Sequence, residues 1–167
     1  MIKKLKIMGW MGLVGLALSA LACAGDAPAV KGASVAGDTR NSVAFGDIQG
    51  KDWTLVEYRN GSNTVPIDRT KPTATNVYTL RFNQDNTVSG MGAPNRYFGP
   101  YTIGESNNLS IGMVAATLMA PLFENEDLKE SDYFSFLGRV SRWELQNGRL
   151  ELYTTVEDGS QIVLIFS

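Results

Sequence analysis

Short runs of alternating hydrophobic and polar residues recur from residue 53 to the end of the chain, and most of them end at a turn signal. Alternation with a period of two is typical of strands that bury one face. Asn147-Gly148 and Asp158-Gly159 are typical of tight hairpin turns, so the last three strands should form a meander. The pattern predicts strands at 53–58, 64–67, 77–82, 87–90, 97–103, 109–112, 142–145, 150–155 and 162–166.

Two stretches lack this alternation and are compatible with helix. Residues 114–122 are apolar as far as Pro121, before which a helix should stop. Asn125 should cap a second helix, with Glu126 and Asp127 in its first turn, where acidic groups are favourable against the helix dipole. An apolar stripe at helical spacing should face the core from this second helix: Leu128, Tyr133, Phe134, Leu137 and Val140.

The order of these elements favours an α+β protein that is mainly antiparallel β. Strands come first, one helical region follows, and a meander closes the chain. Such an order predicts a curled antiparallel sheet with a helix packed into its open side, in one core with Trp53. The helix would also hide strand edges that otherwise pair with other chains.

The first 22 residues have the build of a secretory signal peptide. Lys3, Lys4 and Lys6 precede the apolar stretch from Ile7 to Leu21, which is shorter than the roughly 20 residues of a membrane helix. The segment ends in Ala20-Leu21-Ala22-Cys23, which resembles the lipobox of bacterial lipoproteins and implies cleavage before Cys23 and lipidation of that residue.

A plain Ala-x-Ala cleavage is the alternative, because the lipobox usually has leucine where this chain has Ala20. If Cys23 carries a lipid, it tethers the protein to a membrane. Ala24 follows Cys23 in place of aspartate, and by analogy with bacterial sorting this favours the outer membrane, facing the periplasm.

Composition then divides the chain into a signal peptide at 1–22, a flexible tether at 23–46 and a folded domain at 47–167. The tether is rich in Ala, Gly, Ser and Val, and a remnant without a role is the alternative reading of it. Loss of the leader's three lysines takes the net charge from −2 to −5. An acidic domain without a basic cluster is not typical of nucleic-acid binding, so we expect no nucleic acid partner.

The side chains that usually carry catalysis are scarce. The chain has no histidine and one cysteine, which excludes Ser-His-Asp and Cys-His catalysis. We expect no cofactor, no metal and no enzymatic activity. An acidic run lacks the glycine and ligand spacing of a calcium loop, so it should be a solvated helix start: Glu124, Glu126, Asp127, Glu130 and Asp132.

The stretch from Val88 to Tyr101 is the most constrained part of the sequence, with three glycines and two prolines in fourteen residues. In a structural interpretation, Asn95 hydrogen-bonds backbone in the Gly-Ala-Pro bend while Tyr97 and Phe98 face opposite sides of a strand. In a functional interpretation, Arg96 beside exposed aromatic residues forms a recognition patch. The candidate site residues are Asn95, Arg96, Tyr97, Phe98 and Tyr101.

The order of several short motifs resembles the META domain family, which includes the bacterial heat-shock lipoprotein HslJ. They are Trp53-x-Leu55, Leu80-x-Phe82, Val88-Ser89-Gly90, Asn95-Arg96-Tyr97-Phe98-Gly99-x-Tyr101, Leu109-x-Ile111-Gly112, Thr117-x-Met119-Ala120, Leu137-x-x-Val140, Leu150-x-Leu152 and Leu164-x-Phe166.

The resemblance implies an incomplete, open antiparallel β-barrel carrying a helix, similar in outline to the pilotin lipoproteins of secretion systems. It also implies an envelope location and an association with stress response and antibiotic tolerance. The family has no established catalytic residues. This chain departs from it at Pro94 and Pro121, where the family commonly has cysteines, and the resemblance implies that these positions lie close together.

We therefore expect a non-catalytic binding or chaperone-like module for an envelope protein or an apolar ligand. A hydrolase using Glu105 or Glu124 with another acid is one alternative, and a purely structural envelope protein is another. Carboxylate chemistry needs two acids within about 5–10 Å in a cleft. A binder needs an apolar groove with few charges.

Overall fold

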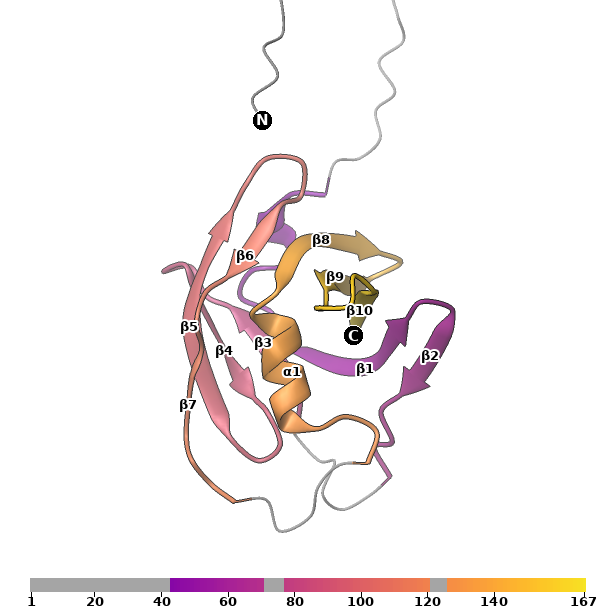
Figure 1. Cartoon of the computed structure of the whole chain (residues 1–167). Coiled ribbons are helices and arrows are strands. Elements are labelled where there is room, and N and C mark those ends of the chain that lie inside the picture. Colours follow the sequence, from indigo (N-terminus) through magenta and orange to yellow (C-terminus); the bar gives the residue numbers. More distant parts are fainter. Residues whose placement is uncertain (1–42, 71–76, 121–125) are drawn as a thin grey trace, which may run out of the picture. The chain divides into compact units, whose positions relative to one another are not determined.

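The computed structural model describes residues 43–70, 77–120 and 126–167 (Figure 1). Cys23, Pro121, Glu124 and Asn125 lie outside these ranges, as do the leader and almost all of the tether. The lipid anchor and the closeness of Pro94 to Pro121 therefore stay predictions. Within the described ranges, no helix is both long and apolar enough to cross a membrane.

The described chain is built mainly from antiparallel strands, as the alternation predicts. A short 3-10 helix, η1 (Phe45–Asp47), precedes them, and one α-helix, α1 (Glu130–Leu137), interrupts them. The strands are β1 (Trp53–Asn60), β2 (Asn63–Pro66), β3 (Thr79–Phe82), β4 (Thr87–Met91), β5 (Arg96–Ile103), β6 (Leu109–Ile111), β7 (Ala115–Ala116), β8 (Val140–Gln146), β9 (Arg149–Thr155) and β10 (Gln161–Phe166).

The strands curl into a nearly closed barrel. Their order is β6-β5-β4-β3-β1-β10-β9-β8, with β2 paired to β1 and β7 paired to β5. The two ends of this order meet at an isolated bridge between Asn108 and Arg142, where Trp143 N donates to Asn107 O at 3.0 Å. A bridge does not seal a seam as a full ladder does, so the structure confirms the open barrel with a helix.

Helix α1 lies between the β3–β5 strands and the β8–β10 strands (Figure 1). Tyr133 and Leu137 stand one turn apart on the same helix face and are buried in one core cluster with Trp53. Phe134 is half-buried against that cluster. The structure thus confirms that the helix and the sheet share a core. The other two stripe residues, Leu128 and Val140, are buried but lie outside the helix.

Two helix predictions were wrong, the first in type over its described residues and the second in where it begins. Residues 114–120 are not helical, because Ala115 and Ala116 pair with β5 as strand β7. Helix α1 begins at Glu130, so Glu126 and Asp127 precede it instead of forming its first turn. Asp127 is held by non-local hydrogen bonds, since its Oδ2 accepts from Asp68 N at 3.0 Å and its carbonyl accepts from the Tyr58 hydroxyl at 3.3 Å.

The turn signals of the closing meander form hairpins as predicted. Asn147 and Gly148 both have positive φ, 52° and 78°, as the tight turn between β8 and β9 requires. Gly159, at φ 83°, stands between β9 and β10, and Asp158 Oδ1 accepts from Ser160 N at 2.8 Å beside it.

Candidate functional site

The candidate residues of β5 divide into an outward and an inward group. Arg96 and Phe98 are exposed on the outer face of the strand, whereas Tyr97 and Tyr101 are buried on its inner face. Asn95 is buried just before the strand. Because alternate side chains of a strand face opposite ways, Arg96 and Phe98 are available to a partner, and the two tyrosines belong to the core.

The two inward tyrosines join elements inside the barrel. The Tyr101 hydroxyl donates to Asn83 O at 2.7 Å and accepts from Gln49 Nε2 at 2.6 Å. The Tyr97 hydroxyl donates to Thr79 O at 2.9 Å and lies 3.0 Å from the Tyr133 hydroxyl of α1. Burial raises the pKa of both Tyr97 and Tyr133, so both stay neutral near neutral pH. These contacts are structural.

The Asn95 side chain holds the segment around β7. It is only 6% exposed. Its Oδ1 accepts from Thr117 Oγ1 at 2.8 Å and from Met119 N at 2.7 Å, while its Nδ2 donates to Met119 O at 3.1 Å. One buried amide thereby fixes the backbone of the segment that carries the Thr-x-Met motif.

Glu130 ties this node to α1, which corrects its assignment to a solvated acidic run. Its Oε1 accepts from Ala93 N at 2.5 Å and from Asn95 N at 2.7 Å, and its Oε2 accepts from Asn95 Nδ2 at 2.6 Å. A side chain on Gly92 would collide with the Glu130 carboxylate and with the Phe134 ring. The Gly-Ala-Pro-Asn bend is therefore a structural joint between β5 and the first turn of α1.

A largely apolar surface lies outside this joint, over β5 and β7. Phe98 is 64% exposed, and its register partner is Ala115 of β7. The chain on either side of β7 presents Met113, 93% exposed, Leu118, 100% exposed, and Met119, 50% exposed. Strand alternation from Ala115 places Met113 and Met119 on the face of Phe98, and Leu118 at the edge of that face with its side chain turned to the opposite side. Together these residues are called the β5–β7 surface: Arg96, Phe98, Met113, Met119 and, at its edge, Leu118.

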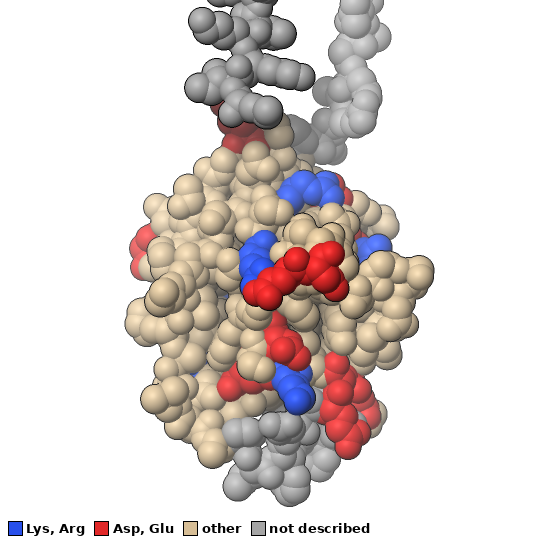
Figure 2. All heavy atoms as spheres, viewed as in Figure 1, with Lys and Arg blue, Asp and Glu red and all other residues tan. Residues whose placement is uncertain are grey.

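Arg96 is the cation of the β5–β7 surface. Within the described part of the chain it makes no ion pair, whereas Arg81 on β3 pairs with Asp52 at 3.0 Å. Beside Arg96 lies a hollow of about 360 Å³, which Thr79, Ser89 and Met91 also line. On the face shown in Figure 2, charges gather over α1 and the β9–β10 turn, and the flank carrying β5 and β7 is largely uncharged.

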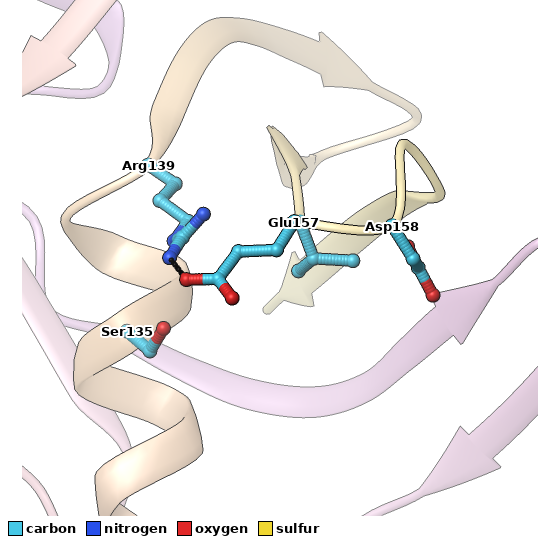
Figure 3. Close-up of a pocket in the computed structure, with 5 residues that line it drawn as sticks. Ser135, Arg139, Glu157 and Asp158 are labelled. Atoms are coloured by element: carbon cyan, nitrogen blue, oxygen red, sulfur yellow. Dashed lines mark hydrogen bonds and ion pairs between the residues drawn. The ribbon is translucent and has the colours of Figure 1, made fainter.

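A second hollow, of about 410 Å³, lies between α1 and the β9–β10 turn (Figure 3). Arg139 Nη2 lies 2.6 Å from Glu157 Oε1, and this ion pair crosses the hollow. Asp158 points away from the ion pair. Ser135 lines the hollow without a hydrogen bond from its hydroxyl to a described carboxylate, so the arrangement does not resemble an activated nucleophile.

The structure brings together a carboxylate pair that the sequence analysis missed. Glu144 and Glu151 are register partners in the β8–β9 hairpin, and the Tyr153 hydroxyl lies 3.0 Å and 2.6 Å from their respective Oε2 atoms. Glu105, the acid considered for hydrolysis, is exposed elsewhere, in the turn before β6. Counting outward from Asn147-Gly148 places residue 144 opposite 151, so the signal was present in the sequence.

Arginines brace this pair. Arg142 contacts Glu144, and Arg59 Nη2 lies 2.6 Å from Glu151 Oε1. Burial works to raise the pKa of Glu144, but hydrogen bonds from Gln146 and Tyr153 and the charge of Arg142 hold it below its usual value. Glu144 is therefore ionised at neutral pH and cannot serve as a general acid. The arrangement is a charged brace on the outer face of the sheet.

Metal-binding groups of three or more His, Cys, Asp or Glu side chains do not occur among the described residues. The site that the described geometry favours is thus the β5–β7 surface, with Asn95, Tyr97 and Tyr101 as the structure beneath it.

Known proteins are similar to this chain in sequence and in fold. Residues 46–166 match the family model of the META domain. The fold is similar to an NMR structure of a protein from Burkholderia xenovorans, with a TM-score of 0.54 and 19% identity over 73% of this chain and 85% of that one. A crystal structure of a DUF4847 family protein from Bacteroides vulgatus gives a TM-score of 0.49, 13% identity and coverage of 72% and 93%. No curated protein matches the chain.

Proposed function

Since this chain belongs to the META domain family, we propose that it is an envelope lipoprotein whose folded domain is a non-catalytic binding or chaperone-like module. In this proposal Cys23 carries a lipid and holds the domain at the outer membrane, facing the periplasm. The role in stress response or antibiotic tolerance is the one that the family resemblance implies.

The observation that carries the binding role is the β5–β7 surface. Single exposed hydrophobic residues are normal on proteins, whereas several on one face mark an interaction site. The β5–β7 register places Phe98, Met113 and Met119 on one face. Arg96 belongs to the residue types that dominate binding energy at interfaces, and Phe98 to the aromatic residues enriched there. Pairing with β4 holds the backbone of Arg96 and Phe98, and Asn95, itself bonded to Glu130, holds Met119. Both support a preformed surface.

The anchor rests on the place of the sole cysteine, at the end of a signal-like segment. Replacing Cys23 by Ser tests it. The variant should leave the membrane fraction, and the mass of the processed protein should lack the lipid. If the variant stays in the membrane with the same mass, the protein is not a lipoprotein of this kind.

The binding role is tested with the full chain as bait in a detergent extract of the cell envelope. Arg96→Ala and Phe98→Ser should each lose the partner that the unchanged protein retains. Arg81→Ala is the matched control, because Arg81 is a half-buried arginine on an outer strand face that pairs with Asp52. If all four proteins retain the same material, or none retains any, the β5–β7 surface is not a binding site and a purely structural role would fit better.

A further inference from the structure

Strand β7 leaves one side of its backbone without a partner among the described residues. Thr117 N donates to Arg96 O at 3.0 Å, and Ala115 is the register partner of Phe98, so the backbone groups of Ala115 and Thr117 face β5. In an antiparallel ladder successive residues alternate, and the N–H and C=O of Ala116 therefore point away from β5. Ala116 is exposed, and none of the hydrogen bonds of the described chain uses its outward groups.

This free edge continues beyond the two residues of β7. The Asn95 side chain bonds both N and O of Met119, as a neighbouring strand would. The ladder itself ends at Ala116, but Met119 is bonded to Asn95 and Thr117 to Arg96, so an extended backbone between them would turn the N–H and C=O of Leu118 outward. Ala116 and Leu118 thus present two successive sets of outward backbone groups at the spacing of a strand.

The edge lacks two of the devices that usually protect a strand from pairing, although the two-residue length of β7 is itself a third. Proteins blunt an exposed edge with charged side chains or proline. Strand β2 ends in Pro66, and β8 carries Arg142 and Glu144. The chain along β7, residues 113–120, reads Met-Val-Ala-Ala-Thr-Leu-Met-Ala and contains neither a charge nor a proline.

The chemistry of this edge selects among occupants. A lipid surface would cover Met113 and Leu118, but hydrocarbon cannot satisfy the outward backbone groups of Ala116 and Leu118. An extended peptide satisfies them, because its own N–H and C=O groups complete the ladder. Arg96, which has no ion pair with any described residue, adds a charge preference. A strand added beside β7 would lie two strand spacings from β5, roughly 10 Å. Arg96 and an acidic side chain of the added strand can span this distance if both extend toward each other across Thr117.

We propose that the β5–β7 surface binds an extended segment of another polypeptide, which adds as a strand to the outer edge of β7 and sets an acidic side chain against Arg96. This inference rests on the proposed binding function and specifies its partner class. Apolar side chains of the added strand would lie against Phe98 and Met119.

A displayed library of random dodecapeptides, selected on the full chain, tests the strand. Ala116→Pro is the decisive variant, because it removes the outward N–H and leaves the bonds of Ala115 and Thr117 to β5 in place. Ala116→Val keeps the N–H and is the matched control. Selected peptides should bind Ala116→Pro at least tenfold more weakly than the unchanged protein, and Ala116→Val within twofold of it.

The charge preference is tested by exchange. Selected peptides should carry an acidic residue, and Arg96→Glu should weaken their binding at least tenfold. Replacing the acid of the peptide by lysine should restore binding to Arg96→Glu. If Ala116→Pro melts at a lower temperature than Ala116→Val, amide hydrogen exchange of the unchanged protein decides instead, and the Ala116 and Leu118 amides should become protected when a selected peptide is added.

Several outcomes would contradict the addition of a peptide strand to β7. They are no enriched peptide, peptides that bind Ala116→Pro and Ala116→Val equally, and exchange protection confined to other amides. Two further results would name a different occupant: sedimentation of the chain as a dimer that Ala116→Pro dissociates, or binding to phosphatidylglycerol vesicles that Ala116→Pro leaves unchanged. If the full chain still retains an Arg96-dependent partner from the envelope extract while these tests fail, the proposed binding function is supported and strand addition is contradicted.

Discussion

Glu130 and Asn95 are joined by two hydrogen bonds, one from the Asn95 backbone amide at 2.7 Å and one from its side-chain amide at 2.6 Å. Glu130 opens helix α1, and Asn95 directly precedes β5. Asn95 also holds Met119, so this pair of residues connects three segments that are distant in the sequence. The Met119 end of the β5–β7 surface depends on that connection for its fixed backbone.

Removing the Glu130 carboxylate should destabilise the fold. Glu130→Ala leaves the N–H groups of Ala93 and Asn95 without their charged acceptor. Hydrogen bonds to charged groups contribute about 1.5–3 kcal/mol, so the free energy of unfolding in urea should fall by about 2–3 kcal/mol. Asp132→Ala, an exposed acid of the same helix, is the control and should change it by less than about 0.5 kcal/mol. Equal effects of the two variants would contradict the joint.

Leu137 and Leu118 form a matched pair for testing the core. Leu137 is fully buried on the inner face of α1, whereas Leu118 is fully exposed beside β7. Leu137→Ala should lower the free energy of unfolding by about 2–5 kcal/mol, because it removes buried methyl groups and leaves a cavity. Leu118→Ala should leave stability nearly unchanged. A loss below about 0.5 kcal/mol for Leu137→Ala would place that helix face in solvent.

Gly90 is required by a close approach between strands. A Cβ at Gly90 would overlap the carbonyl of Thr79 on β3 and crowd the Tyr97 hydroxyl. Gly90→Ala should therefore cost about 1–3 kcal/mol of stability or more, as overpacked cores do. Gly46→Ala is the control, because its Cβ would meet open space in η1. Thermal melting of the two variants measures the difference. Similar melting temperatures would contradict the close approach of β4 at Gly90 to its neighbours β3 and β5.

Stability should fall in alkali through the buried tyrosines. Burial raises the pKa of Tyr78, Tyr97 and Tyr133 in the folded protein, whereas unfolded tyrosine titrates near about pH 10. Their contribution is complete below about pH 10 and is lost above it, because the unfolded chain then gives up protons that the folded chain keeps. The free energy of unfolding should decline by up to about 1.4 kcal/mol per pH unit for each of the three groups.

The measurement is urea unfolding across the alkaline range with tyrosinate absorbance recorded in parallel. Tyr133→Phe should reduce the slope with pH. Ionisation of these tyrosines near pH 10 in the still-folded protein would contradict the raised pKa values.

The strands could be predicted from the sequence because alternation and turn residues are local signals. Asn147-Gly148 fixes the register of β8 and β9 by counting alone. Segment 113–120 could not be assigned this way, since alanine, leucine and methionine favour a helix in isolation. Its extended form comes from β5 and from the Asn95 side chain, more than twenty residues away in the case of Met119.

The candidate site was predictable in part for the same reason. The strand alternation separates Arg96 and Phe98 from Tyr97 and Tyr101, as the structure has them. Glu130 carried no local mark of its role, because its partners Ala93 and Asn95 are 37 and 35 residues away. A carboxylate in an acidic run is usually solvated, and here the non-local amides of the bend override that tendency.

The binding role of the β5–β7 surface is the central claim, and cross-linking in living cells tests it most directly. A photoreactive phenylalanine analogue replaces Phe98 in one strain and Leu118 in a second. In a third, control strain it replaces Thr155, which is exposed at the end of β9. We predict a light-dependent adduct with another polypeptide from positions 98 and 118, abolished by Arg96→Glu, and none from position 155. The same adducts from all three positions, or no adduct from 98 and 118, would contradict the account.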